Sequence, residues 1–454
     1  MHNLITKYNV PVPRYTSYPP ANFFHENFGE EELNKAIEAS NHQEPQHLSF
    51  YIHIPYCRKM CYYCGCNSYP MQRQTEVEAY VDAVLKEIER VCSKIDKNRK
   101  IAQIHYGGGT PTAISSSYIK KINKALLEKF ECIREPEIAI ECHAGYMSTE
   151  DFETLIGAGF NRMSIGIQDF NADVLKAVNR IPPKMPIEDI VSLLRANNIR
   201  INFDFIYGLP RQTVESFSDT IQKAIALSPD RLVTFSYAHV PHIYKRQTLL
   251  EKSGLPTEIV KKNLYESARK LLLDGEYEQI GLDHFVKKDD ELSLASRQKT
   301  LHRNFQGYCT RRTTGQVYAF GVTAISQLAG AYGQNTKDIG EYVEKINRGG
   351  IPVKKGYILS TDEQITREVI TEMMCNEQID WIEIAKRLHL SPQNVKAATA
   401  YSDTQLQAFA ADGIIYFDEN SIVMREKGSP FIRNVAASLD KLLINTDKTF
   451  SKPI

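Results

Sequence analysis

F-Y-I-H-I-P-Y-C-R-K-M-C-Y-Y-C-G-C-N, residues 50–67, joins a strand-like run to a dense group of cysteines. Apolar residues alternate with others over residues 48–54, which is typical of a strand, and Pro55 ends it because proline has no N–H to donate. The cysteines that follow are Cys57, Cys61, Cys64 and Cys66. A free cysteine in a core packs as a small apolar residue. Core packing alone does not explain why four cysteines stand in one loop. The group therefore indicates a ligand set.

The first three of these cysteines form the pattern C-x3-C-x2-C. Three thiolates in one short loop suit a 4Fe–4S cluster in which three irons are held by the protein and the fourth stays open to a ligand. A zinc site normally takes four ligands, in two close pairs separated by a longer loop, and no second pair lies near. A zinc loop or a disulfide pair is the alternative for this spacing.

Six strand–helix units follow one another in the first half of the chain. The predicted strands cover residues 48–54, 101–106, 137–141, 162–167, 201–206 and 231–237. Consecutive units of this kind predict a parallel sheet with right-handed crossovers. Because six strands cannot complete an eight-stranded barrel, we expect an α/β fold with an open, three-quarter (β/α)6 barrel. Periodicity alone leaves a flat, doubly wound sheet as the alternative.

A polar residue, a cysteine or a glycine stands where each predicted strand ends. These residues are Cys57, Gly107, Glu141, Gln168, Asp204, Tyr207, Tyr237 and His239. In parallel α/β folds the ligand site lies at the carboxyl edge of the sheet, so these residues are expected to form one site.

Several stretches together resemble one known family. C-x3-C-x2-C after a strand resembles the radical S-adenosylmethionine (SAM) superfamily, and the added cysteine in C-x3-C-x2-C-G-C narrows the resemblance to the oxygen-independent coproporphyrinogen III oxidases. The supporting motifs are R-Y-T-S-Y-P (14–19), G-G-G-T-P-T (107–112), G-I-Q-D-F (166–170), D-F-I-Y-G-L-P (204–210), Y-A-H (237–239) and H-R-N-F-Q-G-Y (302–308). The likeness runs from residue 14 to the C-terminus.

The resemblance implies a 4Fe–4S cluster on Cys57, Cys61 and Cys64, and two SAM molecules. The residues matched to the cluster-bound SAM are Tyr51, Tyr63, Gly108, Glu141 and Ile325. Those matched to the second SAM are Gly109, Thr110, Gln168, Arg180, Asp204 and Ala238. The catalytic candidates are Tyr51, Cys66, Phe305 and Gln306. Cys66 is expected near the substrate or radical and not as a ligand, since the fourth iron must stay open.

Plainer interpretations exist for some of these residues. Glu141 is also explained as a solvated carboxylate at a strand end, and Arg180 as half of a surface ion pair. The family often has Asp-Pro after this glutamate, whereas this chain continues with C-H-A-G over residues 142–145, so the residues supporting Glu141 differ. The candidate arginines for steering anionic propionates are Arg14, Arg303, Arg311 and Arg312.

Three parts are expected along the chain: an N-terminal arm or lid (1–45), a radical SAM catalytic domain (46–350) and a mainly helical C-terminal domain (351–454). In the last part Thr361 and Gln364 suggest a capping box, and a helix pair with a small hairpin is winged-helix-like. The two tyrosine side chains in R-Y-T-S-Y-P are typical of a segment that lies over a polar ligand. The C-terminal domain is interpreted as a docking or lid domain rather than a DNA-binding one.

Composition limits the partners. Lys plus Arg and Asp plus Glu are 55 each, so the formal charge is zero, which argues against nucleic acid as the main partner. No run approaches the ~18 apolar residues of a membrane span, and the N-terminus has no signal-peptide core. We expect a cytoplasmic monomer that acts with an electron donor such as a flavodoxin or ferredoxin.

The implied reaction is oxidative decarboxylation of two propionates of coproporphyrinogen III to vinyl groups, giving protoporphyrinogen IX in heme biosynthesis. The rivals are a heme-directed radical SAM methyltransferase, a related heme-binding chaperone and a zinc-bearing DNA-binding protein. The chaperone has an aromatic residue in place of Cys66 and lacks the F-Q-G-Y run, so these residues favour the oxidase.

Overall fold

The computed structural model describes residues 2–281, 283–444 and 446–451. The six predicted strands are β1 (Leu48–Ile54), β4 (Ile101–Gly108), β5 (Cys132–Cys142), β6 (Arg162–Gln168), β7 (Arg200–Tyr207) and β8 (Arg231–Ser236). They pair in this order, and every pair is parallel. The strand order is linear over the described residues. The predicted open α/β barrel is therefore confirmed.

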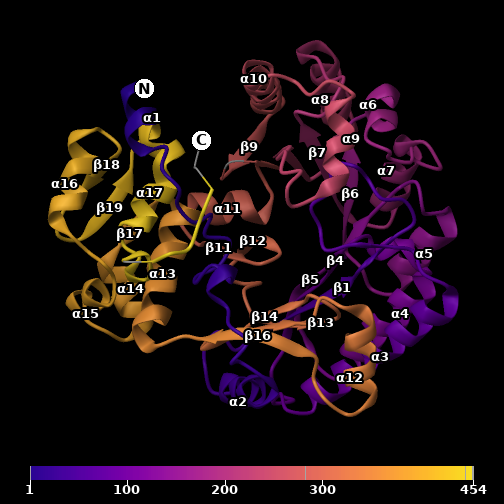
Figure 1. Cartoon of the computed structure of the whole chain (residues 1–454), viewed down its shortest axis with the longest axis horizontal. Coiled ribbons are helices and arrows are strands. Elements are labelled where there is room, and N and C mark those ends of the chain that lie inside the picture. Colours follow the sequence, from indigo (N-terminus) through magenta and orange to yellow (C-terminus); the bar gives the residue numbers. More distant parts are fainter. Residues whose placement is uncertain (1, 282, 445, 452–454) are drawn as a thin grey trace.

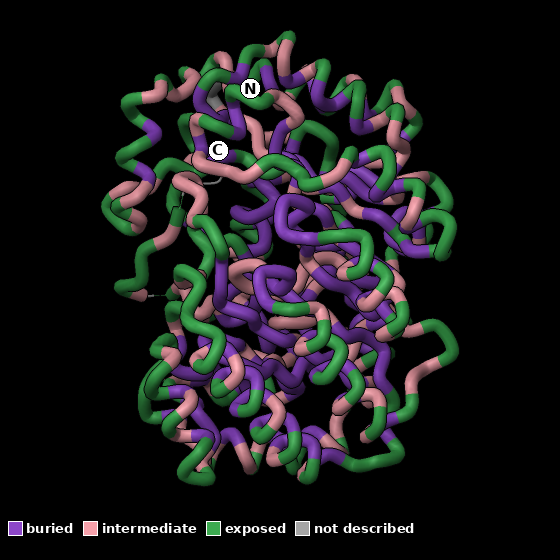
Figure 2. The backbone as a smooth tube through the Cα atoms, turned by 90° about the vertical axis from the view of Figure 1, so that its right-hand side faces the viewer, coloured by how far each residue is buried: buried purple, intermediate pink, exposed green. Residues whose placement is uncertain are grey.

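The helices of these units cover the outer side of the curved sheet (Figure 1). They are α3 (Gln74–Cys92), α4 (Ser116–Leu127), α5 (Thr149–Gly157), α6 (Ala172–Ala177), α7 (Ile187–Ala196) and α8 (Val214–Leu227). The strands turn alternate residues to the two sides, so that Ile52 and Ile54 are fully buried in the main hydrophobic cluster, whereas Tyr51 and His53 face the barrel interior. Figure 2 shows buried backbone through the middle of the molecule and exposed segments around it.

Short strands that the sequence pattern did not predict extend the sheet to twelve strands. On one side β13 (Gln316–Phe320) is parallel to β1 and is followed by β14 (Ile325–Gln327), β15 (Ala331–Asn335) and β16 (Val353–Ile358); on the other side β8 is followed by β10 (His284–Lys287) and β9 (Tyr277–Ile280). A separate hairpin, β11 (Leu301–Asn304) and β12 (Gly307–Thr310), lies outside this sheet. The remaining helices before residue 350 are α1 (His2–Tyr8), α2 (Glu30–Ser40), α9 (Thr248–Glu251), α10 (Glu258–Asp274), α11 (Glu291–Arg297) and α12 (Ile339–Asn347).

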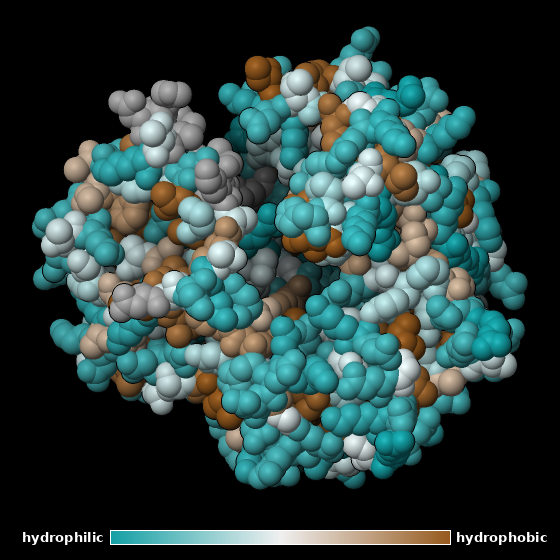
Figure 3. Space-filling model, viewed as in Figure 1, coloured by the Kyte–Doolittle hydropathy of each residue, from teal (hydrophilic) through white to brown (hydrophobic). Residues whose placement is uncertain are grey.

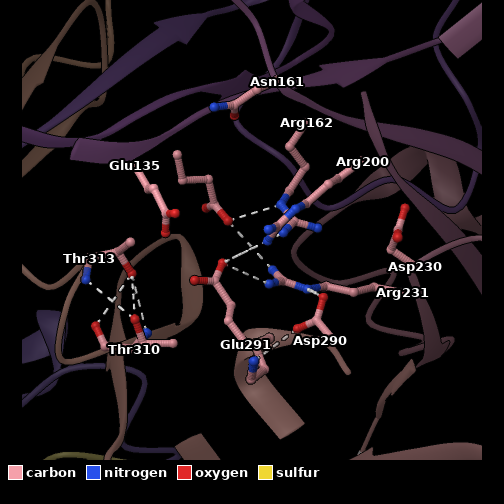
Figure 4. A network of polar contacts seen from close by, with 12 residues as sticks. Glu135, Asn161, Arg162, Arg200, Asp230, Arg231, Asp290, Glu291, Thr310 and Thr313 are labelled. Carbon is pink, nitrogen blue, oxygen red and sulfur yellow. Dashed lines mark hydrogen bonds and ion pairs between the residues drawn. The ribbon is translucent and has the colours of Figure 1, made fainter. Parts of the chain in front are cut away.

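A network of buried charges closes the end of the barrel where the parallel strands begin (Figure 4). We call it the floor network; its members are Glu137, Arg162, Arg231, Asp290 and Glu291. Arg162 Nε lies 2.9 Å from Glu137 Oε2, and Arg231 Nε lies 2.9 Å from Asp290 Oδ2. Burial alone would raise the pKa of Glu137, but the charges of Arg162 and Arg231 lower it to about 2. The network fastens the start of α11 to the barrel.

The C-terminal part has its own hydrophobic cluster, with Trp381 fully buried in it. Its elements are α13 (Thr361–Asn376), β17 (Gln378–Asp380), α14 (Trp381–Leu388), α15 (Pro392–Ala398), α16 (Asp403–Ala411), β18 (Ile415–Phe417), β19 (Ser421–Met424) and α17 (Ile432–Ala437). The predicted capping box begins one residue earlier, because Ser360 caps α13 and Glu363 bonds back to it. No helix in the described ranges is both long and apolar enough to cross a membrane.

The first part of the arm, around residues 8–18, lies against this C-terminal cluster, whereas α2 packs on the main cluster (Figure 1). The hydroxyl groups of Tyr15 and Tyr18 donate to Asp440, at 2.9 and 3.1 Å, and all three residues are buried. Burial raises the pKa of Asp440. The expectation that these phenols lie over a ligand is therefore wrong: a carboxylate that is distant in the sequence takes them. A lid role for the arm stays a prediction.

We expect Asp440→Ala to loosen the arm. The change leaves two buried hydroxyl donors without their acceptor, which costs about 1–3 kcal/mol, so residues 9–20 should be cleaved faster in limited proteolysis. Asp412→Ala is the matched control, because Asp412 binds Lys7 and Tyr8 at a more exposed position. Equal cleavage of the two variants and the unmodified protein would show that Asp440 does not hold the arm.

Candidate active site

The cysteine loop lies at the carboxyl end of β1. Cys57 ends β2 (Tyr56–Cys57), which pairs with β3 (Tyr69–Pro70) and so closes the loop at its base. Each of the three spaced sulfurs meets a different donor: Cys57 Sγ lies 3.4 Å from Thr110 Oγ1, Cys61 Sγ lies 3.7 Å from Arg180 Nη1, and Cys64 Sγ accepts the N–H of Cys66 at 3.4 Å.

The three sulfurs suit a multi-iron cluster better than a single ion. Within the described ranges, no group of three or more His, Cys, Asp or Glu side chains converges closely enough to hold one metal ion. All nine cysteines are free thiols, so the disulfide alternative finds no support in this part of the chain. A hydrogen bond from the Cys66 thiol is the main factor lowering the pKa of Cys64 to about 6, which favours the thiolate that iron requires.

The glycine run after β4 packs directly on the cysteine loop. Gly109 N donates to Ile54 O at 2.9 Å, and a Cβ on Gly109 would come within 2.6 Å of Pro55 O. Gly108 has φ +124°, a conformation that residues with a side chain rarely adopt. The two loops therefore form one block whose backbone a ligand can approach closely.

Below this block a row of side chains faces the barrel interior. The imidazole of His105 stacks on the ring of Tyr51, and its Nε2 lies 3.3 Å from Glu141 Oε1. The Glu141 side chain is 45% exposed, which leaves its carboxylate room for a ligand. A Cβ on Gly107 would come within 2.7 Å of the same carboxylate. His105 is an interior residue that sequence reasoning missed, although its alternation with Gly107 along β4 was a signal.

A second group lies at the ends of β6 and β7. Arg180 Nη1 donates to Tyr63 OH at 3.1 Å, and its Nη2 donates to the carbonyl of Gly166. Asp204 accepts from Ser164 at 2.7 Å, and burial raises the pKa of Asp204 to about 6. The side-chain oxygen of Gln168 is buried without a hydrogen-bond partner among the described residues. A ligand with polar groups would satisfy these side chains.

The loop after β8 covers one flank of the cysteine loop. Gln247 Nε2 donates both to Ala238 O at 3.2 Å and to Tyr63 O at 3.0 Å. A Cβ on Gly65 would come within 3.1 Å of the Tyr244 ring. Residues 238–247 therefore lie over residues 63–66 and bring Ala238 to the same edge as the cysteines.

The β11–β12 hairpin carries Phe305 and Gln306 at its turn, between the barrel and the C-terminal helices (Figure 1). Asn304 Nδ2 donates to Gln103 Oε1 on β4 at 3.1 Å, so the hairpin reaches the barrel interior. Phe305 and Ile325 pack against the same small cluster. The Gln306 side-chain oxygen is buried and unpartnered among the described residues. Figure 3 shows this face of the molecule hollowed between the C-terminal elements and the barrel.

Two of the arginines proposed for steering are placed elsewhere. Arg311 pairs with Glu372 at 2.9 Å, and Arg312 pairs with Glu291 beside the floor network at 2.5 Å. Arg14 donates to Ser451 at 3.3 Å, while Arg303 lies over the Tyr308 ring on the hairpin. The expectation for Arg311 and Arg312 is therefore corrected, because carboxylates from distant segments neutralise them.

Comparisons with known proteins find a matching family model, similar curated proteins and a similar solved structure. Residues 51–224 match the model of the radical SAM superfamily. Curated relatives named oxygen-independent coproporphyrinogen III oxidase include that of Helicobacter pylori strain J99, 37% identical over 99% of this chain and 98% of the relative, and that of Escherichia coli K12, 39% identical over 97% and 95%. The solved structure of the E. coli coproporphyrinogen III oxidase, described as a radical SAM enzyme, is 36% identical with a TM-score of 0.88 and covers 98% of this chain and 99% of its own.

Proposed function

Because the chain belongs to the oxygen-independent coproporphyrinogen III oxidases of the radical SAM superfamily, we propose that it converts two propionates of coproporphyrinogen III to vinyl groups, giving protoporphyrinogen IX. The observation that carries the proposal is the meeting of three separate segments at the carboxyl edge of the barrel. These are the cysteine loop, the glycine run and the polar ends of β5 to β7. The hairpin turn reaches the barrel interior from nearer the floor network, because Asn304 bonds Gln103, which also bonds Glu137.

Cys57, Cys61 and Cys64 would hold the cluster. When bound, a 4Fe–4S cluster and SAM supply a 5′-deoxyadenosyl radical. Tyr63 and the loop of residues 238–247 shield the sulfurs from water. Cys66 is left as a free thiol beside the set, in keeping with a role near substrate rather than as a ligand.

The residues proposed for the cluster-bound SAM line the glycine run and the interior below it. Glu141 accepts from the ammonium group, and Gly108 lets the ligand lie against the backbone. Tyr51 and Tyr63 confine the ligand from two sides, and Ile325 supplies an apolar contact. Gly109, Thr110, Gln168, Arg180, Asp204 and Ala238 remain the proposed set for a second SAM.

In the proposed reaction a hydrogen atom would pass from the β-carbon of a propionate to the 5′-deoxyadenosyl radical. The bond to the carboxylate carbon would then break to release carbon dioxide, and one electron would pass to an acceptor, so that a vinyl group remains. Phe305 and Gln306 are proposed to hold the porphyrinogen at the hairpin turn. The unpartnered Gln306 oxygen suits a pyrrole N–H donor, and the Phe305 ring offers an apolar surface.

The test is an anaerobic assay with SAM, coproporphyrinogen III and dithionite. We expect 5′-deoxyadenosine and a vinyl product to form together. Heme bound tightly without SAM cleavage would instead identify a chaperone, and a methylated product would identify a methyltransferase.

Glu141→Gln tests the proposed SAM contact. An amide keeps the size of the side chain but loses the charge that pairs with an ammonium group, so we expect the dissociation constant for SAM to rise about ten- to a hundredfold. Equilibrium binding to the iron-loaded protein under anaerobic conditions measures the change. Glu128→Gln, at an exposed position following α4, is the control. Unchanged SAM affinity in Glu141→Gln would remove Glu141 from the site.

We also propose a division of the chain into an arm (1–45), a catalytic domain (46–350) and a C-terminal domain (351–454). The separate hydrophobic clusters support the last two, although β16 carries the sheet on to Ile358 and residues of the arm belong to both clusters. Residues 1, 282, 445 and 452–454 of these parts lie outside the described residues. We also propose a cytoplasmic monomer that takes electrons from a flavodoxin or ferredoxin.

A further inference from the structure

A hollow of about 480 Å3 lies beside the cysteine loop. Its walls are residues 143–145 after β5, residues 166–170 at the end of β6, and residues 179–183 after α6. Lys59, from between the first two ligand cysteines, and Lys176, from α6, also line it, and both lysines are exposed. The hollow therefore joins the outer flank of the cysteine loop to the solvent.

The lining of this hollow offers positive charge and hydrogen-bond donors. Lys59 and Lys176 supply the charge, whereas the guanidinium of Arg180, also in the lining, is already engaged by Tyr63 and Gly166. His143 Nδ1 accepts the N–H of Gly145 at 3.1 Å, so the other ring nitrogen of the neutral imidazole carries the proton and acts as a donor. A carboxylate entering the hollow would meet these groups.

Asp169 is the acidic residue in the lining, and it is fully engaged. Its Oδ1 accepts from Thr220 Oγ1 at 2.6 Å and from Asn171 N at 2.8 Å, and its Oδ2 accepts from Gln212 Nε2 at 2.8 Å. The residue is only 1% exposed. Its carboxylate oxygens are therefore held by Thr220, Asn171 and Gln212 and make no ion pair with Lys59 or Lys176 among the described contacts.

Two further cations continue the positive surface around Tyr146. Arg58 Nη1 and Lys184 Nζ both donate to the carbonyl of Tyr146, at 3.3 and 3.1 Å, and Arg58 Nε donates to Ala113 O at 2.8 Å. We call Arg58, Lys59, Lys176 and Lys184 the basic face; all four are exposed. Two acidic residues adjoin this face: Asp173, exposed on α6, and Asp151, which lies near enough to Lys184 for the two charges to interact. Four cations against these two carboxylates leave the face a positive excess.

The basic face includes one part of the cysteine loop that is open to solvent. Arg58 and Lys59 directly follow Cys57, and Lys59 N donates to Tyr146 OH at 2.9 Å. At the other end of the loop, residues 238–247 lie against Tyr63 and Gly65, although Gly65 and Cys66 stay exposed there. A macromolecule can therefore approach the cysteines across the basic face without displacing that cover.

We propose that the basic face docks an acidic one-electron carrier protein, with a carboxylate side chain of the carrier seated in the hollow. This inference rests on the proposed function, in which one electron leaves the reduced carrier and enters the cluster for each SAM cleaved, so that the carrier is oxidised. Opposite charges on two proteins raise the rate of productive encounter and set the orientation of docking. A flavodoxin that presents carboxylates at its docking surface would fit this face.

The test compares two reductants on the double variant Lys59→Glu/Lys176→Glu. With reduced flavodoxin as the electron donor, we expect the KM for flavodoxin to rise about tenfold or more and its dependence on salt to weaken, because two attractive charges become repulsive. With dithionite, which needs no docking surface, the rate should stay within about twofold of the unmodified enzyme. Iron content is measured in both proteins to confirm equal loading.

Lys97→Glu/Lys427→Glu is the matched control, because both lysines are exposed and Lys97 precedes β4 at the opposite end of the barrel. Lys176→Glu alone, which does not touch the cysteine loop, should give part of the effect. An unchanged KM for flavodoxin, or an equal loss with dithionite, would overturn the docking proposal. Failure of the unmodified enzyme with dithionite would instead refute the proposed function.

Discussion

Cys61→Ala should lose both its iron–sulfur absorbance and all measurable SAM cleavage, whereas Cys66→Ala should keep its iron. With only two of the three spaced thiolates left, the cluster loses one of its three anchors. The same loss is expected for Cys57→Ala and Cys64→Ala. Cys66 contacts Cys64 through its own N–H and thiol, so its removal affects the surroundings of the cluster and not its attachment.

Iron and sulfide are counted per chain in proteins purified without oxygen, and 5′-deoxyadenosine is measured after reduction. Cys309→Ala is the matched control, because Cys309 is a buried free thiol on β12 that contacts Thr314 at 3.4 Å, outside the cysteine loop. Full iron in Cys61→Ala would disprove the ligand assignment. Iron lost from Cys66→Ala as completely as from Cys61→Ala would make Cys66 a fourth ligand.

Arg231→Met should destabilise the protein by about 3–5 kcal/mol, because it leaves buried carboxylates of the floor network without their cation. Arg231 binds Asp290 at 2.9 Å and Glu291 at 3.2 Å, and its side chain is only 6% exposed. Methionine fills much of the same space, so the loss of stability reflects the missing charge rather than a cavity. The change in the free energy of unfolding is measured from the shift in the midpoint of denaturant unfolding.

Arg200→Met is the control for this change. Arg200 also reaches Glu291, at 3.5 Å, but its side chain is 53% exposed, so the expected effect is below about 1 kcal/mol. The pKa of Glu137 lies near 2 in the folded protein, below its ordinary value of 4.5, so its contribution is present above pH 4.5 and fades as pH falls toward 2. Equal destabilisation by the two substitutions would show that burial does not govern the network.

The barrel strands and the cysteine site could be predicted because their signals are local. Alternation over seven or eight residues marks a strand, and three cysteines within eight positions mark a ligand loop. Sheet order then follows from the right-handed crossovers, which brings Glu141 and Asp204 to the edge that holds the cysteines. The hairpin of β18 and β19 in the winged-helix-like part could also be predicted, because its signal is local too.

The features that were missed depend on contacts between distant segments. Strands such as β14, with three residues, are too short to show a period, and their pairing is set by neighbours in the sheet. Tyr15 and Tyr18 carry no mark of a partner 425 and 422 residues away. Arg162 and Arg231 look like ordinary surface charges until the strands bring Glu137 and Asp290 beside them.

The arm has a consequence for the order in which the protein matures. Tyr8 stacks on Phe409 and packs beside Phe431, and Asn434 Nδ2 donates to Tyr8 O at 2.9 Å. During synthesis on the ribosome, Tyr8 emerges long before these partners exist. This end of the arm therefore cannot pack in place until nearly the whole chain has been translated. The attachment of Tyr8 is one of the last steps of assembly, and a nascent chain that stalls before residue 431 leaves this end exposed to proteases and chaperones.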